Sequence, residues 1–146
     1  MPTVHDVLAV KGNRVHTVRK DTSVLEATQR MNQHQIGALV VTDSAGRLVG
    51  MFTERDVLRR IVAEQRDSAA TPVEAVMTRK VVSCHEDEML DGARGAMAQR
   101  RIRHLPVVDD EDRLIGLISI GDLNAWCLRD GEARIAYMES YIYGRV

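Results

Sequence analysis

Apolar and polar positions along the chain predict short strands and one-sided helices in an order that occurs twice. The first half predicts a lead-in turn over 3–8, a strand over 14–18, a helix over 24–33, strands over 35–41 and 48–52, and a helix over 53–65. The buried face expected for this last helix consists of Val57, Leu58, Ile61 and Val62. After a polar segment at 67–72, the second half predicts a lead-in over 72–77, a strand over 81–83, a helix over 88–99, strands over 105–108 and 114–118, and a helix over 119–128. Each half is therefore predicted to be a β-α-β-β-α unit.

Residues 36–57 align without a gap with residues 102–123. The identical pairs are Ile36/Ile102, Leu39/Leu105, Val41/Val107, Asp43/Asp109, Arg47/Arg113, Leu48/Leu114, Gly50/Gly116 and Asp56/Asp122. A spacing of this length exceeds that of most solenoid repeats. The chain is therefore predicted to consist of two related α/β units packed on each other.

Residues 132–143 have a helical pattern and no counterpart in the first unit. Ile135, Met138 and Ile142 fall on one face, and Tyr137 and Tyr141 fall on a neighbouring one. Such a helix could cover the core of its own chain. It could also pack on a second copy, because tyrosine is common at protein interfaces.

The composition is that of a soluble globular protein. The chain has 146 residues, of which 45% are hydrophobic and 28% charged, and it has no apolar run of signal-peptide or membrane-spanning length. We therefore expect a cytoplasmic protein without membrane contact. A formal net charge of −1 disfavours a nucleic-acid partner. Cys84, Cys127 and the histidines show no metal-ligand spacing, so no metal is expected, and Cys127 is expected to lie in the core.

The chemistry is expected where the last strand of each unit meets its helix. Thr53 and Asp56 stand there in the first unit, and Ser119 and Asp122 in the second. A hydroxyl followed three residues later by an acid is the ordinary pattern of a helix N-cap. The same groups also suit a ribonucleotide, because a helix N-terminus favours phosphate and a carboxylate accepts hydrogen bonds from ribose hydroxyls.

These motifs resemble those of the tandem cystathionine-β-synthase (CBS) domain family, from about residue 3 to residue 128. The first copy carries the resemblance in residues 37–43, 46–50 and 53–56, and the second in residues 104–109, 114–119 and 122. The resemblance implies an α/β (α+β) fold in which two units pack about a pseudo-two-fold axis. We divide the chain into repeat 1 (1–66), a linker (67–71), repeat 2 (72–129) and a C-terminal helical tail (130–146).

The resemblance also implies two clefts between the units, each binding an adenosine compound. Carried onto this sequence, the first cleft is predicted to contain Thr53, Arg55, Asp56, Lys80, Val82, Ile102, Arg103, His104 and Pro106. The second is predicted to contain Ser119, Gly121, Asp122, Lys11, Arg14, His16, Ile36, Gly37 and Ala38. AMP is the first expectation, and ADP, ATP, NAD(H) and S-adenosylmethionine are alternatives.

The two predicted clefts differ in charge and in space. The first gathers a cationic wall suited to phosphate, consisting of Arg55, Lys80, Arg103 and His104. The second has Gly37 and Ala38 facing Gly121 and therefore more room. We expect a mononucleotide in the first cleft and a similar or bulkier adenosine compound in the second.

The function expected from the resemblance is regulatory. A non-enzymatic homodimer would sense energy or redox state through adenosine nucleotides and pass the signal to an unidentified partner protein. One alternative is a structural or dimerisation module whose clefts are unused. Another is an enzyme acting on a bound nucleotide, which is disfavoured because neither cleft has an evident nucleophile, base or metal triad.

Overall fold

The computed structural model describes the backbone of residues 1–143, and the side chains of residues 1–131 and of Met138. The first half contains α1 (Val4–Lys11), β1 (Thr17–Arg19), α2 (Val24–His34), β2 (Ala38–Thr42), β3 (Leu48–Thr53), α3 (Glu54–Asp56) and the π-helix η1 (Val57–Val62). The second contains the 3₁₀ helix η2 (Val73–Ala75), α4 (Leu90–Arg100), β4 (His104–Val108), β5 (Leu114–Ser119) and α5 (Ile120–Tyr143). The mixed α/β fold is as the sequence predicts.

Two small sheets meet at their hairpins. In the first, β1 is parallel to β2 and β2 is antiparallel to β3; in the second, β4 is antiparallel to β5. Arg47 forms a β-bridge with Arg113, flanked by hydrogen bonds of 3.0 Å from Leu48 N to Asp112 O and from Leu114 N to Gly46 O. The two hairpins thus exchange equivalent hydrogen bonds, as expected for a pseudo-two-fold arrangement.

The prediction of a strand over 81–83 is wrong. Only Cys84 pairs with the second sheet, through a single parallel bridge to Val107. In the first repeat Val40 donates its N–H to the carbonyl of His16 at 3.3 Å. Pro106 occupies the corresponding position in the second repeat and has no N–H to donate, so the parallel ladder is one bond shorter there.

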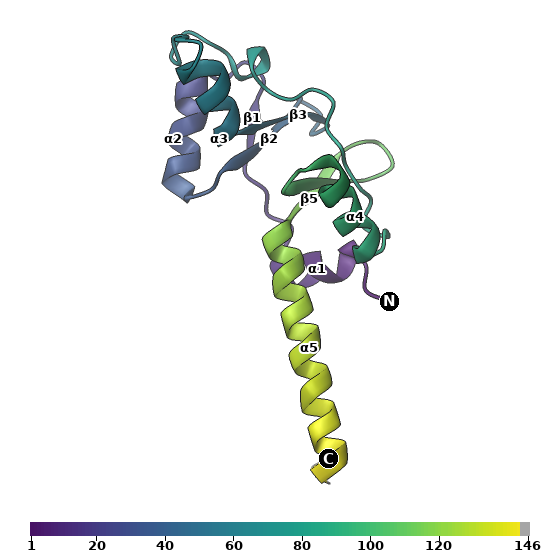
Figure 1. The fold of residues 1–146 in the computed structure, drawn as a ribbon. Helices are drawn as coiled ribbons and strands as arrows, with labels where there is room; N and C mark the ends of the chain where they lie inside the picture. The colour runs from purple at the N-terminus through teal and green to yellow at the C-terminus, as the bar shows by residue number, and fades with distance from the viewer. Residues whose placement is uncertain (144–146) are drawn as a thin grey trace.

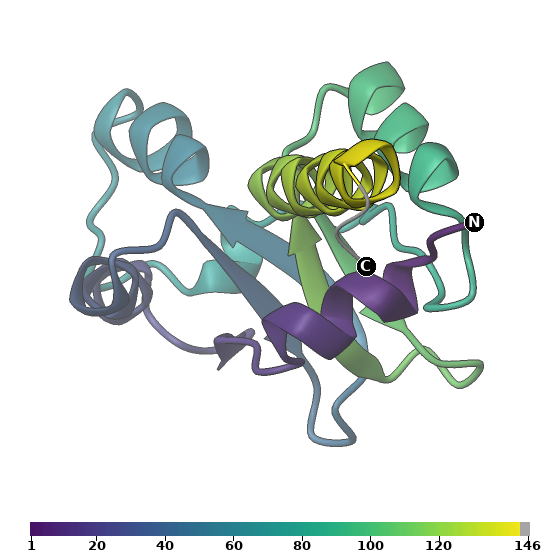
Figure 2. The ribbon, with the colours of Figure 1, turned by 90° about the horizontal axis from the view of Figure 1, so that it is seen from below.

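The lead-in segments exchange places between the repeats. Val4, Val7 and Leu8 belong to a core cluster made otherwise by the second repeat. The cluster of the first repeat contains the corresponding residues of the second lead-in, which are Val73, Val76 and Met77. Figure 2 shows α1 beside α5 and the second sheet. Each hydrophobic core is therefore completed by the other half of the chain.

The helix after β3 buries less than its pattern predicts. It continues α3 as the π-helix η1, with a 3.0 Å hydrogen bond from Ala63 N to Leu58 O. Ile61 is buried and Val57 is partly buried, but Leu58 and Val62 are 63% and 62% exposed. The predicted face assumed α-helical periodicity, whereas η1 is a π-helix that leaves Leu58 and Val62 exposed.

The separate tail helix predicted over 132–143 is instead the second half of α5, which runs unbroken through Gly131. Figure 1 shows α5 extending beyond α1 and away from the two sheets, and Met138 is 59% exposed. The backbone of this half of α5 therefore leads away from both sheets. The side chains of Tyr137, Tyr141, Ile135 and Ile142 lie outside the described residues. Cys127, expected in the core, is exposed on α5, whereas Cys84 is buried.

Candidate functional site

The first strand-to-helix junction is a complete helix cap. Thr53, the last residue of β3, donates its backbone N–H to Asp56 Oδ2 at 3.0 Å. Its hydroxyl lies 3.4 Å from the same oxygen. The other oxygen, Oδ1, is 3.9 Å from Arg60 Nε, and Asp56 is 8% exposed. The carboxylate is thus fixed in position by its own turn of helix.

The second junction has the same cap and a further partner. Ser119 N donates to Asp122 Oδ2 at 2.8 Å, and Asp122 N donates to Ser119 Oγ at 3.1 Å. Lys11, at the end of α1, donates to the same Oδ2 at 2.6 Å and also to the carbonyl of Leu117. The structure therefore brings together Lys11 and Asp122, which the sequence places in one cleft.

These contacts determine the ionisation of Asp122. Burial acts to raise the pKa of its carboxyl, but the hydrogen bonds from the Lys11 ammonium and the Ser119 backbone outweigh it, so the pKa lies below the ordinary value. Asp122 is consequently an anion at neutral pH. An ionised carboxylate only accepts hydrogen bonds, as the recognition of sugar hydroxyls requires.

His104 lies between charges from both halves of the chain. It pairs with Ser119 across the β4–β5 ladder. Burial lowers its pKa, and so does the positive charge of Lys11, while the carboxylates of Asp122 and Glu54 act in the opposite direction. The net pKa is below the ordinary value for histidine, so the ring is mostly neutral at pH 7. It is a hydrogen-bonding group, and not the cation that the sequence analysis expected.

The other residues of the first predicted cleft divide into exposed cations and core residues. Arg55, Lys80 and Arg103 are exposed, and none of them takes part in an ion pair within the described part of the chain. Val82 and Ile102 pack against the core of the second repeat. Pro106 is buried in β4, and its carbonyl accepts from Cys84 N at 2.9 Å. No ion pair joins Asp56 to these cations within the described residues.

The remaining residues of the second predicted cleft have varied surroundings. His16 stacks on His34 with ring centroids 4.1 Å apart, and burial, the charge of His34 and that of Arg14 all lower its pKa. Arg14 is exposed, Ile36 packs against the first core and Ala38 lies in the cluster between the sheets. A Cβ added at Gly121 would have only Ser119 Oγ within contact distance, at 3.5 Å. His16 is therefore engaged with α2 and not with Asp122.

Two groups near these junctions were not singled out from the sequence. The carboxylate of Glu54 lies over Gly37, where an added Cβ would come within 3.1 Å of it. It therefore occupies part of the space that Gly37 was expected to leave open. An alignment of the repeats could have drawn attention to Glu54, because the corresponding residue of the second repeat is the uncharged Ile120. The carbonyl of Leu117, which accepts from Lys11, leaves no signal in the sequence.

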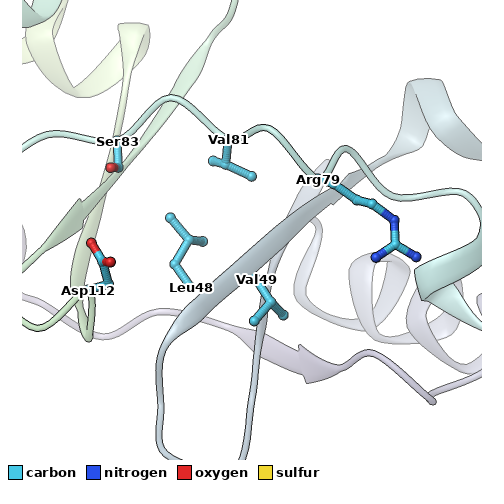
Figure 3. A pocket seen from close by; sticks show the side chains of 6 residues that line it. All are labelled: Leu48, Val49, Arg79, Val81, Ser83 and Asp112. Carbon is cyan, nitrogen blue, oxygen red and sulfur yellow. The ribbon is translucent and has the colours of Figure 1, made fainter.

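A separate pocket of about 180 Å³ lies near the pseudo-two-fold axis, lined by Leu48, Val49, Arg79, Val81, Ser83 and Asp112. Figure 3 shows Leu48 and Val81 facing one another, with Ser83 and Asp112 to one side and Arg79 to the other. The pocket adjoins the start of β3, whereas Thr53 ends that strand about 16 Å away at the usual rise per residue. It is therefore distinct from the two helix caps.

Among the described residues, no three His, Cys, Asp or Glu side chains form a group suited to a metal ion. None of the helices within the described residues is long and apolar enough to cross a membrane. The groups that the two junctions can offer to a ligand are therefore backbone N–H groups, hydroxyls, two fixed carboxylates and nearby cations.

Comparison with known proteins gives a consistent result. The family model of the CBS domain matches residues 4–63 and 73–128. A CBS domain-containing protein of Bacillus subtilis, YhcV, is 39% identical over 123 residues, which cover 84% of each chain. A solved CBS-domain protein from Burkholderia ambifaria is 40% identical with a TM-score of 0.82, covering 88% of this chain and 96% of its own. The CBS-domain pair of protein MJ0100, solved with 5′-methylthioadenosine and S-adenosylmethionine, is 30% identical with a TM-score of 0.77, covering 90% of this chain and 98% of its own.

Proposed function

The chain belongs to the CBS-domain family, and from this premise we propose that it is a non-enzymatic regulatory module that binds adenosine nucleotides in the cytoplasm. Its repeats would hold the ligand at the two helix caps. AMP is the first candidate, followed by ADP, ATP, NAD(H) and S-adenosylmethionine. The output would be passed to a partner protein.

The observation that carries this proposal is the matched pair of caps. In each, a carboxylate is fixed at a helix N-terminus by the N–H of a Thr or Ser three residues before it. Asp56 and Asp122 would accept hydrogen bonds from ribose hydroxyls, and the hydroxyls of Thr53 and Ser119 would contact phosphate at the positive ends of the helices. Arg55, Lys80 and Arg103 are exposed cations available to phosphate. The MJ0100 pair, which was solved with two adenosine compounds, supports this ligand class.

A ligand at these positions could act as a signal because of the exchanged lead-ins. Lys11 belongs to α1, which packs with the second repeat, and its ammonium donates a hydrogen bond to Asp122. A compound that alters this contact would shift α1 relative to α5. The ligand can change the equilibrium between the two arrangements of α1 only by the difference in its binding free energy for them.

We propose that the regulatory unit is a homodimer. Leu58, Val62 and Leu128, which we call the apolar face, are 63%, 62% and 68% exposed. Val62 and Leu128 occupy corresponding positions in the two repeats. Burying exposed apolar side chains drives association, and a two-fold dimer needs a surface that complements itself. A second copy of the chain fits both conditions.

The test is the thermal stability of the purified, ligand-free protein with AMP, ADP, ATP, NAD⁺, NADH and S-adenosylmethionine. A ligand at 100 times its Kd adds about 2.7 kcal/mol to the stability of the folded state, which raises the Tm by several degrees. Asp56→Asn and Asp122→Asn keep an oxygen for the cap while removing the charge, so each should abolish the response of its own site. Leu25→Gln, on the exposed part of α2, is the control and should leave the response unchanged.

A Tm that no adenosine compound raises would contradict the nucleotide-binding function. A Tm increase that survives when Asp56→Asn and Asp122→Asn are combined in one double variant would place the ligand away from the caps. Either result would favour the structural module.

A further inference from the structure

Lys11 ties the two halves of the chain together at the second helix cap. Its ammonium lies 2.6 Å from Asp122 Oδ2 and also contacts the Leu117 carbonyl. The side chains of Lys11 and Asp122 are 32% and 24% exposed. Because both side chains are partly exposed, water can solvate either group when the contact opens, so the ammonium can be transferred to another anionic partner.

The contact occupies an acceptor that a sugar would need. Asp122 Oδ2 receives the N–H of Ser119 and the ammonium of Lys11, so its two lone pairs are both engaged. Oδ1 is left as the outward acceptor. A vicinal diol that hydrogen bonds to both carboxylate oxygens must therefore displace Lys11.

Displacement leaves Lys11 without an anionic partner unless the ligand supplies one. The ring of His104, whose pKa the charge of Lys11 helps to lower, is neutral or positive in its two protonation states and so cannot replace the carboxylate. A phosphate on the ligand would accept the ammonium in a charge-assisted hydrogen bond, whereas an uncharged nucleoside would not. The free energy of binding at the second cleft therefore depends on the charge of the ligand.

Within the described part of the chain, the first cap has no such contact. Asp56 is approached by Arg60 at 3.9 Å, from its own helix, and Lys80, which follows the second lead-in as Lys11 ends the first, has no ion pair among the described residues. The two predicted clefts therefore differ in a way that the sequence does not show. In the described structure, a lysine from the opposite repeat occupies the second cleft and not the first.

We propose that Lys11 is a specificity-determining residue of the second cleft: it holds Asp122 in the ligand-free chain and transfers to the phosphate of a 5′-phosphorylated adenosine compound, so that this cleft discriminates against uncharged ones. The inference rests on the proposed nucleotide-binding function. It adds a preference among adenosine compounds and a residue responsible for it.

The test is isothermal titration of the full chain with AMP and with adenosine. An Asp56→Asn background isolates the second cleft. In this background AMP should bind at least tenfold more tightly than adenosine. Adding Lys11→Met should reduce that ratio at least fivefold, through weaker binding of AMP and unchanged or tighter binding of adenosine. Lys20→Met, at an exposed lysine outside both predicted clefts, is the matched control and should leave the ratio unchanged.

A ratio that Lys11→Met leaves unchanged, or that falls equally with Lys20→Met, overturns the inference while the proposed function stands. Lys11→Gln, which keeps a polar side chain, replaces the Met variant if circular dichroism shows that the latter is unfolded. If neither AMP nor adenosine binds to the wild-type chain, the inference is overturned, and the proposed function fails with it only if ADP, ATP, NAD⁺, NADH and S-adenosylmethionine also leave the Tm unchanged. The wild-type thermal panel therefore distinguishes the two failures.

Discussion

Asp56 and Asp122 each perform a structural task in the absence of any ligand. Each carboxylate accepts the N–H of the residue that caps its helix, at 3.0 and 2.8 Å. This fixes the carboxylate rotamer before a ligand arrives. A preorganised acceptor loses little conformational freedom on binding, so the capping role and the proposed recognition role support each other.

The lowered pKa of Asp122 predicts a pH-dependent contribution to stability. Burial acts to raise this pKa, but the hydrogen bonds from Lys11 and Ser119 lower it further than burial raises it. A carboxyl whose folded-state pKa is depressed stabilises the protein above its unfolded pKa of about 4, and this contribution is lost as pH falls through the folded value. Asp122→Asn should therefore unfold at lower urea than wild type at pH 7, and the difference should shrink below pH 4.

Urea titrations at pH 7, 5 and 3 would measure this difference. Asp110→Asn, a change at an exposed side chain distant from the cap, is the control for general acid effects. A difference between wild type and Asp122→Asn that stays constant from pH 7 to pH 3 would contradict the assignment.

Individual site residues were predictable to different degrees. The two caps follow directly from hydroxyl-to-acid spacing at a strand end, and the grouping of Lys11 with Asp122 came from the family resemblance. The charge state of His104 depends on burial and on Lys11, Asp122 and Glu54, which come from separate segments. A sequence gives no distances among such segments, so neither this state nor the position of Glu54 over Gly37 could be derived.

The helices and strands lie where the sequence predicts them, except where packing or a missing N–H donor changes the result. Hydrophobic periodicity located most of the described helices and strands within a few residues, but it divided α5 into two helices. The strand at 81–83 failed because Pro106 lacks the N–H that Val40 uses, a feature that is visible in the sequence once the repeats are aligned. The exchange of lead-ins is not visible, because Val4, Val7 and Leu8 have the same pattern whichever core they enter.

The exchanged lead-ins predict unequal costs at two equivalent glycines. A Cβ on Gly50 would meet Met77 and the Thr78 carbonyl, the latter at 3.0 Å, and that carbonyl is held by Met51 N–H. The atoms nearest to a Cβ on Gly116 belong to the side chain of Leu8, whose methyl groups would lie at 2.8 and 2.9 Å. A side-chain tip can rotate away but a bonded carbonyl cannot. Gly50→Ala should therefore cost about 1–3 kcal/mol, and Gly116→Ala less.

Chemical denaturation of both variants would test this order. Gly92→Ala, in α4 with nothing within 4 Å of its Cβ position, is the matched control and should stabilise the protein by about 1 kcal/mol, the difference in helix propensity. A Gly116→Ala variant less stable than Gly50→Ala would show that the two lead-ins do not pack as described.

At the scale of the whole molecule, the apolar face predicts self-association. Wild type should sediment as a dimer. Leu58→Gln combined with Val62→Gln should sediment as a monomer with little change in unfolding free energy at low protein concentration, because these side chains are 63% and 62% exposed in the single chain. Analytical ultracentrifugation over a range of concentrations measures the association, and urea titration of the dilute protein measures the stability. A monomeric wild type would contradict the proposed dimer, and a dimeric double variant would place the interface elsewhere.

The central claim concerns the whole molecule, since the proposed ligand would lie where the two repeats meet. Backbone amide chemical shifts of isotopically labelled protein, followed during titration with AMP, test it most directly. The account predicts that the largest changes occur at residues 53–56 and 119–122, with a further change at Lys11. Changes confined to residues 79–83 and Asp112, around the separate pocket, or no changes at saturating AMP, would contradict it.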